Sequence, residues 1–407
     1  GDGKFSVLNG NHGITDADYF QREQYQAKFE EIFEQLRAEG LFQRKIAEIR
    51  NSDLFKLSPF KALNTDQEIA VESILEGLFA DLEAGQQSTA IVEGGPGTGK
   101  TIVAVYLLKL LVDIRDRATE ILTEGETLFD EFFTPGYPEL LEGARIGLVV
   151  PQQSLRASIK QVFRSVPGLS PDMVLTPYEV AEAPERFDLL VIDETHRLTQ
   201  WGAQAVGVLT KKYREISQRL ALPGERWEEL TQVDWILRKS RHQVFLLDEG
   251  QAVRPHDVPQ RVLTKVRERS GRDGRGYRLH SQMRVQAGGD YIDYVRAVLS
   301  DNQPATPAAF PDYDLRFYDD PVSMYEAILA RDAEHGLARL VAGYAWKWNS
   351  SKGRFADDGA PVWDVVVDGL KLRWNQRPVD WINSPTSVEE VGSIHTVQGY
   401  DLNYAGV

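Results

Sequence analysis

The fold is decided by the stretch Ala90-Ile91-Val92-Glu93-Gly94-Gly95-Pro96-Gly97-Thr98-Gly99-Lys100-Thr101, which is followed by the apolar run Ile102-Val103-Ala104-Val105-Tyr106-Leu107-Leu108. Gly94 to Thr101 match the pattern G-x-x-x-x-G-K-[ST], in which backbone N–H groups close around phosphates and a helix N-terminus points at them. A glycine-rich segment by itself would indicate only a turn. The apolar strand before this one and the apolar helix after it favour a nucleoside triphosphate site, where Lys100 reaches the β- and γ-phosphates and the Thr101 hydroxyl binds Mg²⁺.

Length and composition limit the classes of protein to consider. The chain has 407 residues, which is more than one ordinary core holds and predicts two or three domains. Its 42% hydrophobic and 26% charged residues are typical of a globular protein in water. There is neither a signal-like start nor an apolar run of membrane-spanning length, so we expect a cytoplasmic protein without membrane contact. The absence of cysteine excludes disulfides and thiolate metal sites.

The charge balance is acidic. Lys and Arg number 46 against 61 Asp and Glu, a net charge of −15. A protein with this balance is not coated in positive potential, so any nucleic acid would have to bind in a local groove.

Three apolar strands downstream of the glycine loop each end in a polar cluster. They run from Ile146 to Val150, from Phe187 to Ile192 and from Val244 to Leu247. Continuous apolar strands that alternate with helices predict a parallel sheet covered on both faces. Ligands of such sheets bind beyond the carboxyl ends of the strands, where these polar clusters fall.

The chain divides into three predicted parts. Residues 1–60 form a helical arm that ends its first helix near Gly40, 61–256 form an α/β domain with the glycine loop, and 257–407 form a second α/β domain. We expect the linker near Pro255 to Pro259. The second domain contains predicted strands at 338–344, 365–367 and 391–395.

The pair Asp193-Glu194 follows the second of these apolar strands. An acidic pair at a strand end is often only a solvated turn. Beside a phosphate loop, Asp193 would hold Mg²⁺ directly or through water, and Glu194 would act as the general base on the attacking water. The pair therefore predicts hydrolysis in addition to binding.

Three further side chains are weaker candidates. Gln67 precedes the helical run 68–79, and its amide can both donate to and accept from an adenine edge. Gln251, in Asp248-Glu249-Gly250-Gln251, could contact the γ-phosphate or its water. Arg284, in Ser281-Gln282-Met283-Arg284, is a candidate arginine finger. The basic stretch from Arg261 to Arg278 could follow a phosphate backbone, but its composition favours a solvated charged face.

In their order along the chain, these motifs resemble the series found in superfamily-1 helicases, and more narrowly the bacterial DNA/RNA helicase domain related to Schlafen group 3 AAA ATPases. The resemblance covers about 18–407 and rests on the following segments: Leu63-Asn64-Thr65-Asp66-Gln67, Gly94 to Thr101, Val150-Pro151-Gln152-Gln153-Ser154-Leu155-Arg156, Val191-Ile192-Asp193-Glu194, Leu247-Asp248-Glu249-Gly250-Gln251, Ser281-Gln282-Met283-Arg284 and Ile394-His395-Thr396-Val397-Gln398-Gly399-Tyr400-Asp401.

The resemblance implies a P-loop NTPase of α/β class with two RecA-like parallel-sheet domains, ATP between them and single-stranded DNA or RNA across the top. The implied nucleotide contacts are Gln67, Gly94, Gly95, Pro96, Gly97, Thr98, Gly99, Lys100, Thr101 and Asp401, with Asp401 at the ribose. The implied catalytic residues are Lys100, Glu194, Gln251 and Arg284, and the Mg²⁺ ligands are Thr101 and Asp193. Nucleic-acid contacts are implied for Pro151, Gln152, Ser154, Thr176, His395 and Thr396.

Two hypotheses from different classes follow. The first is a Mg²⁺- and ATP-dependent helicase or translocase on single-stranded nucleic acid. The second is an ATP-dependent switch or scaffold subunit of a larger complex, for instance in defence against foreign DNA, which the acidic balance favours. The chain reaches Val407 soon after the Gln398-Gly399 motif, whereas helicases of this kind continue through another strand to an arginine-bearing motif, so we expect an incomplete second domain. A small-molecule kinase would not explain Gln251, Arg284 and Gln398 together.

Overall fold

The structure is a computed structural model. It describes residues 22–43, 46, 49, 52–60, 63–117, 128–202, 207–248, 257–281, 288–301, 303–310, 313–355, 359–377, 381–393, 396–397, 400 and 402–407. The chain forms two compact units, Gly1–Ser52 and Asp53–Val407. The predicted arm of residues 1–60 is therefore too long, because α3 (Asp53–Lys56) belongs to the larger unit and Leu57 packs against its main core.

The smaller unit contains α1 (Arg22–Ala38). Gly40 follows this helix with a φ of +84°, a conformation that glycine adopts without steric cost and that ends helices, as predicted. The Phe33 ring stacks on Phe42 with centroids 4.7 Å apart, which holds the segment after the helix against its last turns.

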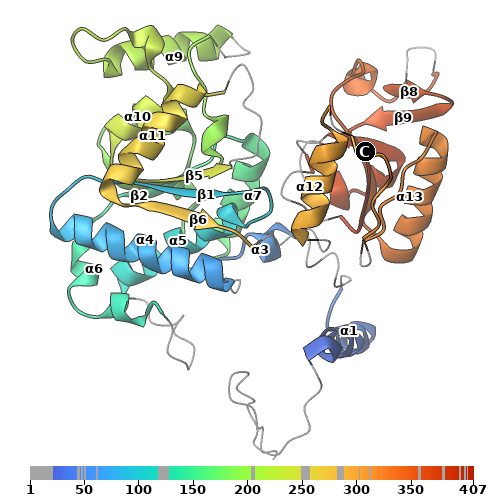
Figure 1. The fold of residues 1–407 in the computed structure, drawn as a ribbon, viewed down its shortest axis with the longest axis horizontal. Helices are drawn as coiled ribbons and strands as arrows, with labels where there is room; N and C mark the ends of the chain where they lie inside the picture. Colours follow the sequence, from blue (N-terminus) through green and yellow to red (C-terminus); the bar gives the residue numbers. More distant parts are fainter. Residues whose placement is uncertain are drawn as a thin grey trace, which may run out of the picture. The chain divides into compact units, whose positions relative to one another are not determined.

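The larger unit contains a six-stranded sheet in the order β3-β2-β4-β5-β1-β6, in which every neighbouring pair is parallel (Figure 1). Its strands are β1 (Thr89–Gly94), β2 (Ile146–Val149), β3 (Val174–Leu175), β4 (Phe187–Ile192), β5 (Ser240–Asp248) and β6 (Gly276–Leu279). The apolar runs thus form the predicted parallel sheet, and the run at 187–192 matches β4 from end to end.

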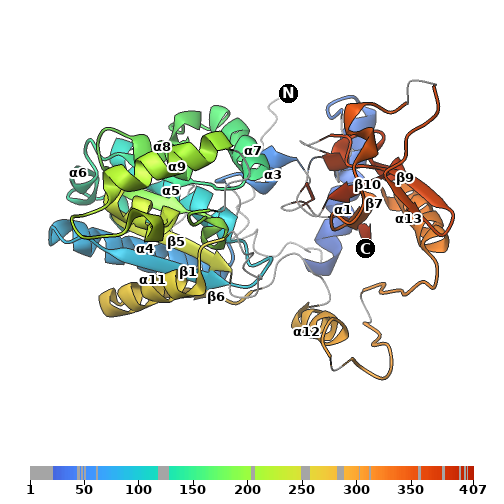
Figure 2. The same ribbon diagram turned by 90° about the horizontal axis from the view of Figure 1, so that it is seen from above.

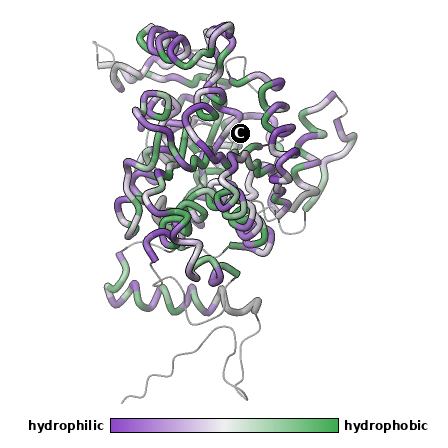
Figure 3. The backbone as a smooth tube through the Cα atoms, turned by 90° about the vertical axis from the view of Figure 1, so that its left-hand side faces the viewer, coloured by the Kyte–Doolittle hydropathy of each residue, from purple (hydrophilic) through white to green (hydrophobic). Residues whose placement is uncertain are grey.

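Helices cover both faces of this sheet because successive strand residues point to opposite sides. Val92 and Leu246 belong to one core, whereas Ile91 and Phe245 belong to the other. The first core is closed by α4 (Thr65–Glu83), α5 (Lys100–Asp116) and α7 (Gln153–Arg164), and the second by α8 (Pro177–Glu182), α10 (Gln232–Lys239) and α11 (Gln260–Asp273). Along several helices short hydrophobic and hydrophilic segments alternate (Figure 3), as expected where each turn has one buried and one exposed side.

Short elements complete this part of the chain. They are α6 (Tyr137–Leu140), α9 (Gly207–Leu220) and the 3₁₀ helices Asp130–Phe133, Pro171–Met173, Thr195–Arg197 and Trp227–Glu229. Tyr213 of α9 packs on Trp235 of α10 with ring centroids 4.3 Å apart, and both side chains are fully buried.

The predicted boundary between residues 256 and 257 is too early. Val258 and Leu263 are buried in the second core of the first sheet, and β6 is a strand of that sheet. The predicted linker at 255–259 also overlaps a packed segment, since buried Asp257 forms a β-bridge with Thr199 and lies 3.5 Å from Arg197. The first domain therefore extends at least to Leu279.

A second sheet follows, with the order β11-β7-β10-β9-β8. Its strands are β7 (Ala338–Ala342), β8 (Val365–Val367), β9 (Leu370–Trp374), β10 (Glu390–Ser393) and β11 (Tyr404–Gly406); the remaining elements are α12 (Gly288–Val298), α13 (Pro321–His335) and the 3₁₀ helices Asn349–Lys352, Trp381–Asn383 and Ser387–Glu389. All pairings are parallel except the β8–β9 hairpin. Helix α13 lies beside this sheet (Figure 2), and its Ile328 belongs to the sheet's core. After the Gln398-Gly399 motif, β11 pairs in parallel with β7.

The parallel first sheet, the mostly parallel second sheet and the loop between β1 and α5 give the predicted α/β fold of a RecA-like P-loop protein. Among the helices that the structure describes, none combines the length and apolarity that crossing a membrane requires.

Candidate functional site

The glycine loop connects the end of β1 to the start of α5. Gly97 and Gly99 have φ values of +83° and +81°, which residues with a Cβ rarely adopt. A Cβ on Gly94 would lie 2.6 Å from Thr98 Oγ1, which itself donates to the Gly95 carbonyl. Gly99 supplies no side-chain cap, so the first N–H groups of α5 are arranged to meet an anion. The loop therefore fits a phosphate group.

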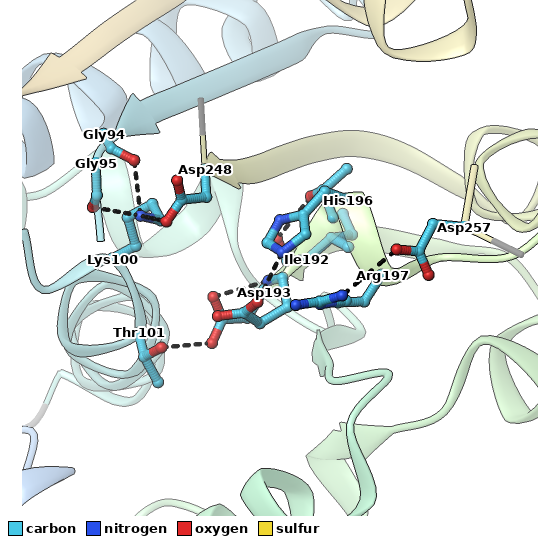
Figure 4. Close-up of polar contacts among 12 residues, drawn as sticks. Gly94, Gly95, Lys100, Thr101, Ile192, Asp193, His196, Arg197, Asp248 and Asp257 are labelled. Atoms are coloured by element: carbon cyan, nitrogen blue, oxygen red, sulfur yellow. Dashed lines mark hydrogen bonds and ion pairs between the residues drawn. The ribbon is translucent and has the colours of Figure 1, made fainter. Parts of the chain in front are cut away.

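Lys100 lies inside this loop. Its Nζ donates to the carbonyls of Gly94 and Gly95, both at 2.8 Å, and to Asp248 Oδ2 at 3.1 Å (Figure 4). Lys100 is 8% exposed and the Asp248 side chain 2% exposed, so this is a buried ion pair. Phosphate oxygens are acceptors of the same kind and could replace these partners.

Thr101 and Asp193, the two predicted metal ligands, are in direct contact. Thr101 Oγ1 donates to Asp193 Oδ2 at 2.7 Å, which joins the first turn of α5 to the end of β4 (Figure 4). Burial and the nearby charge of Glu194 raise the pKa of Asp193 to about 6, against the opposing effect of the Thr101 hydrogen bond. A divalent cation would offset both causes, because it supplies positive charge to a buried carboxylate. These two oxygens therefore fit one side of a cation site.

Glu194 is the first residue after Asp193 and has a φ of +49°, a strained value for a residue with a Cβ. His196 Nε2 lies 3.1 Å from Glu194 Oε2, and the His196 side chain is 1% exposed. Burial alone would raise the pKa of Glu194, but the hydrogen bond and charge of His196, with the charges of Lys100 and Arg197, lower it overall. An ionised carboxylate at this position can accept a proton from water.

Gln67 reaches the same loop from α4. Its Nε2 donates to the Thr98 carbonyl at 3.0 Å, and its Oε1 accepts from the Asn64 backbone at 3.1 Å. Asn64 Oδ1 in turn accepts from the Gln67 backbone at 2.9 Å, which completes a capping box at the start of α4. The sequence placed Gln67 near the nucleotide loop, and here it connects that loop to a helix cap. Its contact with adenine stays a prediction.

The loop, the acidic pair and the sheet order are those of a helicase-type P-loop domain. The family model for the Schlafen group 3 DNA/RNA helicase domain matches residues 87–407. The chain belongs to this family.

The chain is also similar to one curated protein in sequence and to one solved structure in fold. The uncharacterized protein YPL245W of Saccharomyces cerevisiae is 22% identical over 385 residues, which cover 85% of this chain and 74% of the yeast protein. The crystal structure of Pif1 helicase from Candida albicans is 15% identical with a TM-score of 0.28, over 67% of this chain and 54% of the Pif1 chain. The helicase-domain chain thus spans about half the length of the Pif1 structure.

Four predicted site residues lie outside the described residues: Gln251, Arg284, His395 and Asp401. Ser281 is the last described residue before the gap that contains Arg284. Ser281 donates to Asp66 Oδ2 through its backbone at 3.0 Å and through its hydroxyl at 2.7 Å, so Ser281 is tied to the first turn of α4.

The predicted nucleic-acid residues of the first domain gather at one end of the carboxyl edge. Pro151 and Gln152 follow β2, Ser154 lies in the first turn of α7, and Thr176 follows the neighbouring β3. The nucleotide residues instead follow β1, β4 and β5 on the other part of this edge. Arg156 Nη1 donates to the Val150 carbonyl at 2.8 Å and holds the segment after β2.

Two hydroxyls predicted to touch nucleic acid also have local roles. Thr176 Oγ1 accepts from the Glu179 backbone at 3.1 Å and caps α8. Thr396 Oγ1 donates to Asn375 Oδ1 at 2.6 Å, which connects the segments after β10 and β9. Their contact with nucleic acid stays a prediction.

The basic stretch after residue 260 is partly committed to the first domain. Arg267 Nε lies 2.5 Å from Glu93 Oε1, and Arg275 Nη2 lies 2.9 Å from Asp81 Oδ1. These ion pairs favour the interpretation as a charged protein face over a track for a phosphate backbone.

Sequence reasoning missed His196 and assigned no role to Asp248 itself. The only sequence signal for a role of His196 is its position, two residues after the Asp193-Glu194 pair. Across the part of the chain that is described, no cluster of three or more His, Cys, Asp or Glu side chains could hold a metal. A hydroxyl with a single carboxylate suits Mg²⁺, which usually keeps several waters and substrate phosphates as ligands.

Proposed function

We propose that this chain is a Mg²⁺- and ATP-dependent helicase or translocase that moves on or remodels single-stranded nucleic acid. One observation carries the proposal: the start of α5 and the end of β4 bring Lys100, Thr101, Asp193 and Glu194 close together, an arrangement that suits phosphate binding and proton transfer from water. Family membership supports the choice of nucleic acid as the substrate.

Each side chain has a distinct part in this mechanism. Lys100 exchanges Asp248 and the loop carbonyls for phosphate oxygens when nucleotide binds. Thr101 and Asp193 would hold Mg²⁺, which would supply positive charge against the charge that develops on the phosphoryl oxygens. Glu194 orients the attacking water and accepts its proton, and His196 holds the Glu194 carboxylate in place.

Asp248 could transmit nucleotide binding at Lys100 to the end of β5. Exchange of the buried Lys100–Asp248 ion pair for phosphate contacts would change the charge balance around the Asp248 carboxylate, so we propose that the end of β5 rearranges when nucleotide binds. Gln251 is three residues further on, and we propose that it passes this change to the bound strand. Gln67, Arg284 and Asp401 keep their proposed roles at adenine, the phosphoryl group and ribose.

We propose that nucleotide and nucleic acid bind at different parts of the carboxyl edge of the first sheet. Nucleotide binds beyond β1, β5 and β4, while single-stranded DNA or RNA binds beyond β2 and β3 through Pro151, Gln152, Ser154 and Thr176. The second domain contributes His395 and Thr396.

A streptavidin-displacement assay tests whether the chain moves along single-stranded nucleic acid. Streptavidin is bound to one biotinylated end of a single-stranded DNA or RNA oligonucleotide, and its release is followed with ATP and MgCl₂ present. We expect release from one of the two ends only, and none with Lys100→Ala. Oligonucleotide binding without release from either end would favour the alternative, an ATP-dependent switch or scaffold, which the net charge of −15 also suits. In that case, pull-downs made with nucleotide and without nucleotide should recover different sets of bound proteins.

A further inference from the structure

The segment Gly343–Phe355, between β7 and β8, differs in composition from the rest of the chain. Its sequence is Gly-Tyr-Ala-Trp-Lys-Trp-Asn-Ser-Ser-Lys-Gly-Arg-Phe. It combines Tyr, Trp and Phe with Lys and Arg and contains no Asp or Glu, although the whole chain carries a net charge of −15. We call it the aromatic–basic loop. It is a local exception to the acidic balance that argues against nucleic-acid binding elsewhere.

Three rings of the aromatic–basic loop face solvent. Tyr344 is 67% exposed, Phe355 64% and Trp348 36%. Trp346, which lies between Tyr344 and Trp348 in the sequence, instead packs against the core of the second sheet and anchors the loop. Large exposed rings gathered in one segment are uncommon on a protein surface without a binding role.

Hydrogen bonds tie the middle of the aromatic–basic loop to the second sheet. Ser350 donates to both oxygens of buried Asp364, through its backbone at 2.7 Å and through its hydroxyl at 2.5 Å. Asp364 also accepts from the Trp374 backbone at 2.7 Å, and Gln376 Nε2 donates to Ser350 Oγ at 2.6 Å. These bonds fix the middle of the loop to the strand β9, so a ligand would not bear the cost of ordering it.

The exposed rings have defined neighbours on the protein side. The Tyr344 ring meets Trp374 edge to face, with centroids 5.9 Å apart. The guanidinium of Arg373 lies 6.0 Å from the Phe355 centroid and 4.7 Å from that of Trp363. Both rings are supported from the protein, as a stacking surface requires.

The aromatic–basic loop also lies at the ligand side of the second sheet. It begins directly after the carboxyl end of β7, and β10, which pairs with β7 in parallel, ends in the segment that leads to Thr396. Asn375 follows the next strand, β9, and accepts from Thr396 Oγ1. In open parallel sheets this edge is where ligands bind.

We propose that the aromatic–basic loop binds single-stranded nucleic acid, with bases stacked on Tyr344, Trp348 and Phe355 and phosphates near Lys347 and Arg354. The inference deepens the proposed function and rests on it. Aromatic rings beside basic side chains suit this ligand because every base offers a π-face and every nucleotide a negative charge. Lys347 is exposed, whereas Arg354 lies 3.7 Å from Glu390 Oε1, so Lys347 is the first choice for a phosphate contact.

Fluorescence anisotropy with fluorescein-labelled oligo-dT and oligo-U tests the loop on the full chain. Removing one stacking ring by Trp348→Ala or Phe355→Ala should weaken binding by about 5- to 160-fold. Trp348→Phe keeps a ring and should retain most of the affinity. Phe317→Ala is the matched control, because Phe317 is 59% exposed but lies outside the aromatic–basic loop, and it should bind as the unmodified chain does. Thermal unfolding of each variant separates lost binding from lost folding.

A second readout concerns charge and position. Lys347→Gln should reduce the slope of log K against log salt by about 0.7 if Lys347 contacts one phosphate of a single strand. Photo-crosslinking with an oligonucleotide that carries 5-iodouracil should attach to a peptide within the aromatic–basic loop.

The outcomes separate this inference from the proposed function. If the unmodified chain binds oligonucleotide and both ring-to-Ala variants bind equally well, the loop assignment is overturned while the proposed function stands. An equal loss in Phe317→Ala would overturn it too. If the unmodified chain binds neither oligonucleotide, both are overturned. Loss with oligo-dT alone or with oligo-U alone supports the loop and identifies which nucleic acid it holds.

Discussion

Replacing Asp248 by Asn should destabilise the nucleotide-free chain and make nucleotide a stronger stabiliser than it is for the unmodified chain. The Lys100–Asp248 pair has an N–O distance of 3.1 Å, and its side chains are 8% and 2% exposed, so it counts as buried. Removing one charge of a buried pair costs about 3–5 kcal/mol, and because the carbonyls of Gly94 and Gly95 still accept from Lys100, we expect about 3 kcal/mol. For a domain of this size that loss lowers Tm by about 6–12 °C.

Nucleotide should recover most of this loss. Its phosphates give Lys100 new anionic partners, and in the variant they need not displace Asp248. The assay is thermal unfolding of both proteins with and without ADP and MgCl₂. A ligand at 100 times its Kd stabilises by about 2.7 kcal/mol, and the variant should gain more than the unmodified chain at the same concentration.

Asp113→Asn provides the matched control for this experiment. Asp113 pairs with Lys109 on the same helix, α5, and the two side chains are 2% and 6% exposed. This pair lies outside the glycine loop, so Asp113→Asn should lower Tm while its nucleotide-induced shift equals that of the unmodified chain. Equal nucleotide-induced shifts in all three proteins would refute the idea that nucleotide competes with Asp248 for Lys100.

Three further predictions concern single side chains. Glu194→Gln should lower ATP turnover by about 10²- to 10⁴-fold, measured as phosphate release, while nucleotide binding persists; undiminished turnover would remove Glu194 as the general base. Thr101→Val should weaken nucleotide binding in MgCl₂ but not in EDTA, measured by fluorescence titration, and an equal effect in both buffers would argue against a metal ligand. Burial lowers the pKa of His242, so the unfolded chain binds more protons below about pH 6.5 and stability falls as the pH drops from 7.5 through that value. His242→Gln should flatten this part of the curve of unfolding midpoint against pH, and an unaltered curve would contradict the assignment.

The first sheet could be predicted where apolar runs were continuous. Strands β1, β4 and β5 are buried on both faces, which gives the sequence an uninterrupted hydrophobic signal. Strand β6 carried no such signal, because three of its four residues are partly or fully exposed and one of them is Arg278. Only its pairing with β1 shows that β6 belongs to the first sheet, and the sequence does not contain that pairing as a local signal.

The site could be predicted as a set of residue types but not as a set of contacts. The glycine pattern fixes Lys100 and Thr101 locally, within one loop. The bond from Lys100 to Asp248 spans 148 positions and that from Gln67 to Thr98 spans 31, and such pairs depend on how strands assemble. The aromatic–basic loop could not be predicted from the sequence for another reason. Aromatic residues usually belong to a core, and their residue type does not show that they are exposed.

The central claim is that ATP hydrolysis at the glycine loop is coupled to single-stranded nucleic acid. ATP turnover of the chain is therefore the decisive measurement, made in MgCl₂ with and without single-stranded DNA and RNA oligonucleotides and with Lys100→Ala as the inactive reference. The account predicts turnover that rises with at least one of the two nucleic acids and disappears in Lys100→Ala. Turnover that no oligonucleotide stimulates, or that persists in Lys100→Ala, would contradict it.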